Sequence, residues 1–206
     1  AFRMHHYTLE TDRLILRPLT AADAPAVFVW GGDPEVNRYM SYPLERSVAD
    51  AEKWLRTVEE SRPEDGYDFG FVRKEDGALI GSGGTYPRAD GRTWTFGYKL
   101  RRDGWGRGYA TEAARAILAF AQETLGARVF AAEHAVDNPA SGRVMEKCGM
   151  TKEGDFRQRA GHNACRCDLA IYSILREERK YNKKDGHPRS FLFSPLVLYD
   201  PFTYFS

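Results

Sequence analysis

The hydrophobic residues of this chain follow two periods, and their order along the chain predicts the architecture. Alternating apolar and polar positions, rich in branched and aromatic side chains, predict strands. Apolar positions three and four residues apart predict helices. Strands are predicted at residues 13–20, in two halves of a hairpin at 67–86, and at 93–100, 127–136, 151–160 and 164–174. Helices are predicted after Thr20 and Ser47, over 111–125 and after Asn138.

This order predicts an α/β fold with a mixed, mostly antiparallel sheet flanked by helices. The strand at 93–100 and the strand at 129–134 are joined by a helix. Because such crossovers are almost always right-handed and return to the same sheet, we expect these two strands to be parallel neighbours. Residues 1–180 are predicted to form one domain, and residues 181–206 a tail of unknown packing. The tail is apolar and aromatic at its end, so it could pack on the domain or join two copies as a homodimer.

Composition narrows the class of protein. Hydrophobic residues are 42% and charged residues 29% of 206, which is typical of a packed soluble domain. The 30 basic and 29 acidic residues nearly cancel, which argues against a nucleic-acid-binding protein. No apolar run is long enough for a membrane span. The odd set of three cysteines, Cys148, Cys165 and Cys167, indicates a reducing, cytoplasmic location, and its spacing matches no metal site.

Three glycines, Gly104, Gly106 and Gly108, stand within five positions directly before a helix. A dinucleotide-binding fingerprint would need a third glycine where Tyr109 or Thr111 stands, and a phosphate-binding loop would need a following Gly-Lys-Ser/Thr. Both patterns fail. What remains is a turn whose backbone N–H groups, over residues 106–110, meet an anion at a helix N-terminus. Nearby positive charge comes from Arg101, Arg102 and Arg107.

The segment FGYKLRRDGWGRGYATEAARAIL resembles the coenzyme A loop of the GCN5-related N-acetyltransferases, within them the RimJ/RimL type. The resemblance continues in TDRLILRPLTAADA near the start and in NPASGRVMEKCGMTKEG, and it covers residues 9–178. It implies acetyl-CoA as donor, no metal, and a primary amine as acceptor, either a protein N-terminus or a small amine. It also implies direct attack in a ternary complex, and a sheet that splays between the strands at 93–100 and 129–134.

The resemblance also implies the site residues. The pantetheine arm is expected to bond free backbone groups of Tyr98 and Leu100, with the Tyr98 N–H as oxyanion donor. Ser141, one helical turn from Asn138, is expected to protonate the departing thiolate or fix a water that does so. The coenzyme A contacts implied are Phe96, Tyr98, Leu100, Arg101, Gly106, Arg107, Gly108, Tyr109, Ala110, Thr111, Asn138 and Ser141.

The general base is where the sequence departs from the family. Many relatives have a glutamate just before the Gly-Tyr of this strand, but here Thr95 and Phe96 stand there. His134 is the first candidate base, since histidine titrates near neutral pH, and Glu133, which faces the other way, is the second. An α-amino group has a pKa of about 8 and is partly neutral at pH 7, so the missing glutamate favours peptide N-termini or weakly basic amines.

The acceptor pocket is predicted from residues 30–42, 85–94 and 155–167. Its candidate lining is aromatic and apolar: Trp30, Tyr39, Met40, Tyr42, Tyr86 and Trp94. No dense acidic cluster of the kind that a polyamine site needs is present. A second hypothesis is a catalytically silent acyl-CoA-binding or assembly module, which would keep the glycine loop and lack the base. The absent glutamate at Thr95 and Phe96 supports it.

Overall fold

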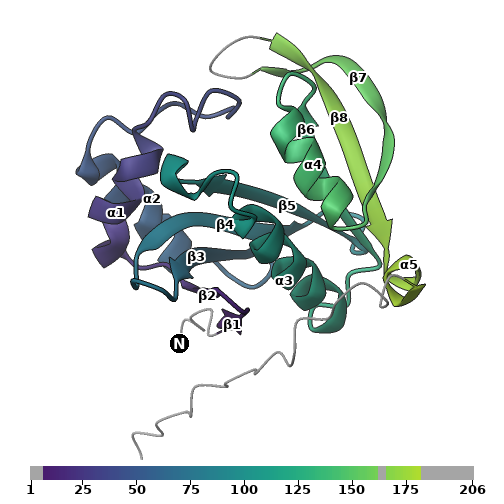
Figure 1. Ribbon diagram of the computed structural model, residues 1–206, viewed down its shortest axis with the longest axis horizontal. Coiled ribbons are helices and arrows are strands. Elements are labelled where there is room, and N and C mark those ends of the chain that lie inside the picture. Colours follow the sequence, from purple (N-terminus) through teal and green to yellow (C-terminus); the bar gives the residue numbers. More distant parts are fainter. Residues whose placement is uncertain (1–6, 162–165, 182–206) are drawn as a thin grey trace, which may run out of the picture.

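The computed structural model describes residues 7–161 and 166–181, and there the chain forms an eight-stranded sheet in the order β1-β2-β3-β4-β5-β6-β8-β7 (Figure 1). Each neighbouring pair is antiparallel except β5 with β6. The predicted mixed, mostly antiparallel sheet is confirmed. The strands are β1 Leu9–Glu10, β2 Leu14–Pro18, β3 Tyr67–Arg73, β4 Leu79–Pro87, β5 Thr93–Leu100, β6 Val129–Ala135, β7 Thr151–Gly161 and β8 Arg166–Leu175.

Helices cover both faces of the sheet (Figure 1). Phe71 of β3 belongs to the core beneath α3, whereas the next residue, Val72, packs against the cluster built by α1 and α2. Since successive strand residues point to opposite faces, the two cores lie on opposite sides. The helices are α1 Ala24–Gly31, α2 Val48–Glu60, α3 Tyr109–Glu123, α4 Pro139–Lys147 and α5 Arg176–Tyr181, with 3-10 turns η1 Ala21–Asp23 and η2 Arg102–Gly104.

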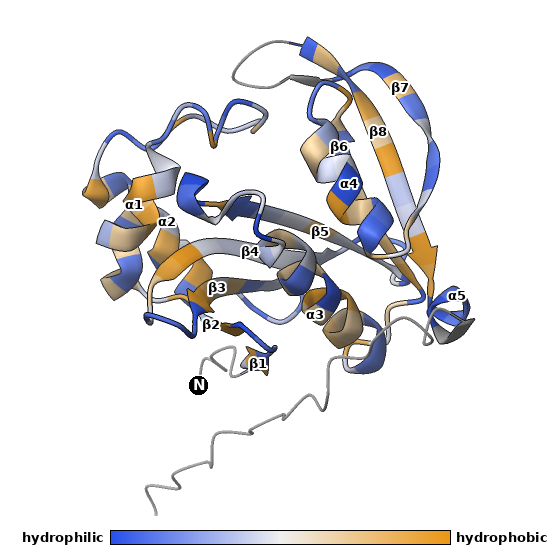
Figure 2. Ribbon diagram, viewed as in Figure 1, coloured by the Kyte–Doolittle hydropathy of each residue, from blue (hydrophilic) through white to orange (hydrophobic). Residues whose placement is uncertain are grey.

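Local sequence signals explain where the helices begin. Ser47 caps α2 by accepting a hydrogen bond from the Asp50 amide at 3.2 Å. Helix α3 begins at Tyr109, two residues before the predicted start, because Gly108 adopts a left-handed conformation (φ +82°) and serves as its N-cap. Figure 2 shows apolar residues on α1, α2 and α3, whereas β7 at the sheet edge is mostly hydrophilic.

The parallel pair β5–β6 is short, and this shortness creates the site. Its register runs from Thr93 beside Val129 to Phe96 beside Ala132. Beyond Phe96, β6 stays paired only with β8, up to Ala135 beside Leu169. The predicted splay of these two strands is confirmed.

Some sequence predictions fall outside the described residues. The tail at 182–206 and the turn at His162 are among them, so the predicted homodimer contact of the tail stays a prediction. Within the described part, no helix is both long and apolar enough to cross a membrane. Cys148 is a free thiol, and the described residues contain no cluster of His, Cys, Asp or Glu able to hold a metal.

Candidate active site

The open part of β5 presents backbone groups to the splay. The Arg101 amide donates to the Ile80 carbonyl of β4 at 2.8 Å, so the odd-numbered residues of β5 direct their backbone groups toward β4. Tyr98 and Leu100 direct theirs to the other side, from which β6 has diverged. The Leu100 carbonyl accepts from the Trp105 indole N–H at 2.7 Å. The Tyr98 amide and carbonyl and the Leu100 amide thus point to the place where the sequence predicts pantetheine.

Two cavities meet at this splay. The first, here called the splay cavity, has a volume of about 430 Å³ and is lined by β5 from Phe96 to Lys99, by β6 from Glu133 to Ala135, and by the α1–α2 segment. The second, the loop cavity, has about 350 Å³ and lies between the β5–α3 loop and α4. Six residues line both: Tyr39, Met40, Tyr98, Lys99, Asn138 and Ser141.

Hydrogen bonds join three side chains where the cavities meet. The Tyr98 and Ser141 hydroxyl oxygens are 3.3 Å apart, and Asn138 Nδ2 donates to Ser141 Oγ at 3.1 Å. Burial raises the pKa of the Tyr98 hydroxyl, so the phenol stays protonated. Asn138 precedes α4 as predicted, but its side chain does not cap the helix. Its amide instead orients Ser141 at the junction.

The glycine loop is built to receive an anion. Gly106 and Gly108 have φ of +72° and +82°, a region that favours glycine, and a Cβ on Gly106 would contact nothing within 4 Å. No side chain caps α3, so its first amides point to the loop cavity. Gly106, Gly108, Ala110 and Thr111 all line that cavity. The bare backbone and the open helix N-terminus fit a pyrophosphate.

Arg13, which sequence reasoning did not select, holds this loop from β1–β2. Its guanidinium donates to Glu112 Oε2 at 2.7 Å and to the Arg107 carbonyl at 2.9 Å, and it lies 4.5 Å from the ring centroid of Tyr109. Glu112 is an acid in the first turn of α3, where it would repel a phosphate. The contact with Arg13 offsets that charge. Two further cations that were not predicted, Arg143 and Lys147, line the loop cavity from α4.

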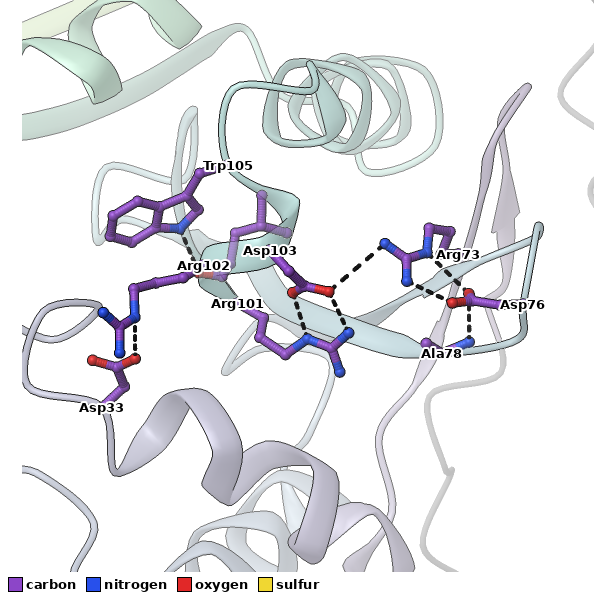
Figure 3. Close-up of polar contacts among 9 residues, drawn as sticks. Asp33, Arg73, Asp76, Ala78, Arg101, Arg102, Asp103 and Trp105 are labelled. Carbon is purple, nitrogen blue, oxygen red and sulfur yellow. Dashed lines mark hydrogen bonds and ion pairs between the residues drawn. The ribbon is translucent and has the colours of Figure 1, made fainter.

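Three predicted arginines are not brought to the cavity. The Arg101 guanidinium is held by Asp103, with both hydrogen bonds at 2.6 Å, and Asp103 also lies 3.9 Å from Arg73 (Figure 3). Arg102 pairs with Asp33 at 2.7 Å. Arg107 is exposed, and it contributes its carbonyl to Arg13. Their charge at the pyrophosphate was predicted from chain proximity, but Asp103 and Asp33 direct the side chains of Arg101 and Arg102 elsewhere.

Two other predicted coenzyme A contacts are Phe96 and Tyr109, the second of which was predicted to bind through its backbone N–H. The Phe96 side chain is buried and stacks on Phe130 with ring centroids 5.9 Å apart, and Phe96 lines only the splay cavity. The Tyr109 side chain is 5% exposed and belongs to the core, so only its backbone at the start of α3 faces the loop.

His134 lines the splay cavity, but both of its ring nitrogens are enclosed. Its Nδ1 donates to the Ala135 carbonyl at 2.6 Å, because a carbonyl can only accept. Its Nε2 is buried without a hydrogen-bond partner among the described residues, and a Cβ on Gly142 would come within 2.8 Å of it. The ring is thus packed beneath α4. Glu133, the second candidate, is exposed and lines the splay cavity.

Some of the side chains predicted for the acceptor pocket line the splay cavity, and others do not. Tyr39, Met40, Tyr42 and Tyr86 line the splay cavity. Trp30 and Trp94 do not line it: Trp30 is fully buried with α1 and α2, and Trp94 packs against the core beneath α3. Tyr39 also donates to the Asp137 carbonyl at 3.0 Å, which joins the α1–α2 segment to the β6–α4 loop.

Comparison with known proteins identifies the family of this chain. The model of the acetyltransferase (GNAT) domain family matches residues 13–151, more than half of the chain. The chain belongs to this family. It is therefore an acetyl-CoA-dependent N-acetyltransferase, and the resemblance of its glycine loop is confirmed at the level of the GNAT domain.

Individual relatives and solved structures agree with this family assignment. YoaA of Bacillus subtilis, an uncharacterised N-acetyltransferase, is 34% identical over 173 residues, which cover 82% of this chain and 96% of YoaA. A GNAT-family acetyltransferase from Bacillus anthracis superposes with a TM-score of 0.76 at 25% identity, over 83% of this chain and 99% of that structure. RimL, a ribosomal L7/L12 α-N-protein acetyltransferase solved with coenzyme A, superposes with a TM-score of 0.74 over 83% of this chain and 99% of that structure. Because the two sequences are only 17% identical, this likeness shows a shared fold alone.

We expect Arg13→Met to weaken acetyl-CoA binding by about three- to tenfold, because the loop loses its contact to Arg107 and Glu112 regains an uncompensated charge. Calorimetric titration of acetyl-CoA measures the change. Arg56→Met, which removes an exposed arginine paired with Glu52 on α2, is the matched control. Equal affinities for the two variants would show that Arg13 does not support the loop.

Proposed function

We propose that this acetyltransferase moves the acetyl group to a primary amine by direct attack within a ternary complex. The observation that carries the proposal is the meeting of two cavities at Tyr98, Asn138 and Ser141. Acetyl-CoA in the loop cavity would place its thioester at this junction, while an acceptor in the splay cavity reaches it from the other side. Two substrates held together need no acetylated enzyme intermediate.

Each part of the junction has a role in this proposal. The Tyr98 amide, directed into the splay, donates to the oxygen that gains negative charge during attack. Ser141, held by Asn138 at 3.1 Å and close to the Tyr98 hydroxyl, supplies a proton to the departing thiolate. Glu133 takes the proton of the acceptor ammonium, in place of His134, whose ring nitrogens are enclosed.

The acceptor that we propose is a small amine or the terminal residue of a peptide. The splay cavity of about 430 Å³ has the size of a small-molecule site. The fold likeness to RimL is compatible with a RimJ/RimL type and a protein N-terminus. The alternative, a catalytically silent acyl-CoA-binding or assembly module, would bind acetyl-CoA but would not transfer its acetyl group to any amine. Thiol release from acetyl-CoA across a panel of amines and short peptides tests the proposal, and binding without release on any of them would contradict it.

We expect Ser141→Ala to lower kcat by about tenfold, because the thiolate is a fair leaving group that gains only part of its stabilisation from a proton. Thiol release measured at saturating acceptor gives the effect. Acetyl-CoA affinity, measured by calorimetry, is the control and is expected to stay within about twofold. A loss in affinity as large as the loss in kcat would mean that Ser141 only binds the co-substrate.

A further inference from the structure

Lys99 is a cation in the splay cavity that the acetyl transfer itself does not use. Its Nζ lies 4.8 Å from the ring centroid of Tyr42 and 6.0 Å from that of Trp54. Nζ also donates to Asn37 Oδ1 at 3.4 Å. Asn37 is 1% exposed, and its Nδ2 donates to the carbonyls of Trp30 at 2.6 Å and Gly31 at 3.1 Å. These bonds fix the amide oxygen toward the ammonium, so the place of the charge is built rather than incidental.

Lys99 makes no ion pair within the described part of the chain. Glu45 is the carboxylate that most affects it, and this charge raises the pKa of Lys99 without forming a salt bridge. Burial has the larger effect and lowers that pKa. A ligand anion against Nζ would favour the charged form and replace the water lost on burial.

Glu133 and Lys99 lie on one face of the sheet. The last pair of the parallel register is Ala132 with Phe96, whose side chains share a face, so by alternation the next residues, Glu133 and Gly97, both project from the opposite face. Lys99 follows Gly97 by two residues, about 7 Å along the strand. A Cβ on Gly97 would meet nothing within 4 Å. The floor between carboxylate and ammonium is therefore bare backbone, open enough for a ligand to lie across it.

We propose that the acceptor carries an anionic group, a carboxylate or a phosphate, in addition to its amine, and that Lys99 binds this group. The proposal rests on the proposed function, since it names the substrate class of the same site. Glu133 then faces the ammonium of the acceptor, and Lys99 faces its anionic group at the other end of the splay cavity. The rings of Tyr42 and Trp54 place the ammonium beside apolar surface, which strengthens a charge-assisted hydrogen bond.

The test uses three series of primary amines matched in chain length, from three to six carbons: amino alcohols, ω-amino acids and aminoalkyl phosphates. Thiol release gives kcat/KM for each compound with wild type, Lys99→Met and Lys53→Met. Lys53 is an exposed residue of α2, so its substitution makes the same change of charge outside both cavities. Calorimetry of the same amines with coenzyme A-saturated protein gives their affinity without turnover.

For wild type and Lys53→Met, we expect kcat/KM to be about tenfold or more higher for one anionic series than for the amino alcohols. Lys99→Met is expected to lose this preference while keeping its activity on the amino alcohols. The series preferred distinguishes carboxylate from phosphate. A displaced α1–α2 segment would lower activity on all three series alike and leave the preference unchanged. Equal use and equal binding of charged and neutral amines by wild type, or a preference that survives in Lys99→Met, would overturn the inference.

The two proposals fail separately. If the amino alcohols are acetylated at their amine as fast as the anionic amines, the proposed function stands and the role of Lys99 is removed. Binding of an anionic amine that depends on Lys99, with no thiol release from any compound, supports the anion subsite and contradicts the proposed acetyl transfer to such amines.

Discussion

Gly108→Asp is expected to weaken acetyl-CoA binding by about a hundredfold or more. The residue is the N-cap of α3 and has φ of +82°, so any side chain there is strained. The added Cβ would lie 3.4 Å from Arg13 Nη2, so the new carboxylate would add a negative charge to the loop and compete with the pyrophosphate for the positive potential there. Repulsion between two anions at such short range outweighs the few favourable contacts that the rest of the loop retains. Calorimetric titration of acetyl-CoA measures the loss.

Two variants separate charge from strain. Gly108→Ala has the same backbone strain without the carboxylate, and we expect it to retain most of the affinity. Gly126→Asp places the same carboxylate at the opposite end of α3, at a glycine with φ of +76° whose Cβ would contact nothing within 4 Å. It is expected to bind acetyl-CoA as wild type does. Unchanged binding by Gly108→Asp would mean that the glycines form a turn with no role in the co-substrate site.

The parts of this fold that the sequence predicted depend on local signals. The crossover from β5 through α3 to β6 follows from the order of predicted strands and helices and from the right-handedness of such connections. It correctly made β5 and β6 the parallel neighbours that splay apart. Asn138 and Ser141 were paired from their spacing on one helix, and they are hydrogen bonded. The glycine loop was selected from its composition, and its two positive φ values agree with that selection.

Most of what was not predicted depends on contacts between distant segments, with one local exception. Arg13 is 99 residues from Glu112 in sequence, and Lys99 is 62 residues from Asn37, so no local sequence pattern predicts either contact. Arg101 was assigned to the pyrophosphate because it precedes the glycines, but Asp103, two residues away, captures its guanidinium. A short-range acidic neighbour was visible in the sequence and could have corrected that assignment.

His134 shows the same limit in one residue. From the sequence it was placed at the end of its strand and selected as a base because histidine titrates near neutral pH. The close approach of Gly142, which encloses Nε2, depends on how α4 packs on β6. Packing of this kind is set by residues of two elements together, so only the structure shows that the ring is enclosed.

Glu133→Gln is expected to lower kcat/KM by about a hundredfold for acceptors with strongly basic amines, the lower part of the range for general bases. Such amines are almost wholly charged at neutral pH and must lose a proton before attack. The loss is expected to shrink for weakly basic amines, which are partly neutral already. Glu133 is the first β6 residue beyond the β5–β6 pairing and lines the splay cavity in which we propose that the acceptor binds, so its carboxylate would be near the proton it removes.

His134→Gln is the paired variant, because it changes the adjacent residue and the other candidate base. With both ring nitrogens enclosed, we expect at most about a threefold change in kcat/KM. Its effect should instead appear in thermal stability, since the ring packs against Gly142 and lies 5.5 Å from the Tyr172 ring centroid. A larger kinetic loss in His134→Gln than in Glu133→Gln, rising with acceptor basicity, would return the base to His134 and require α4 to move away from β6 during turnover.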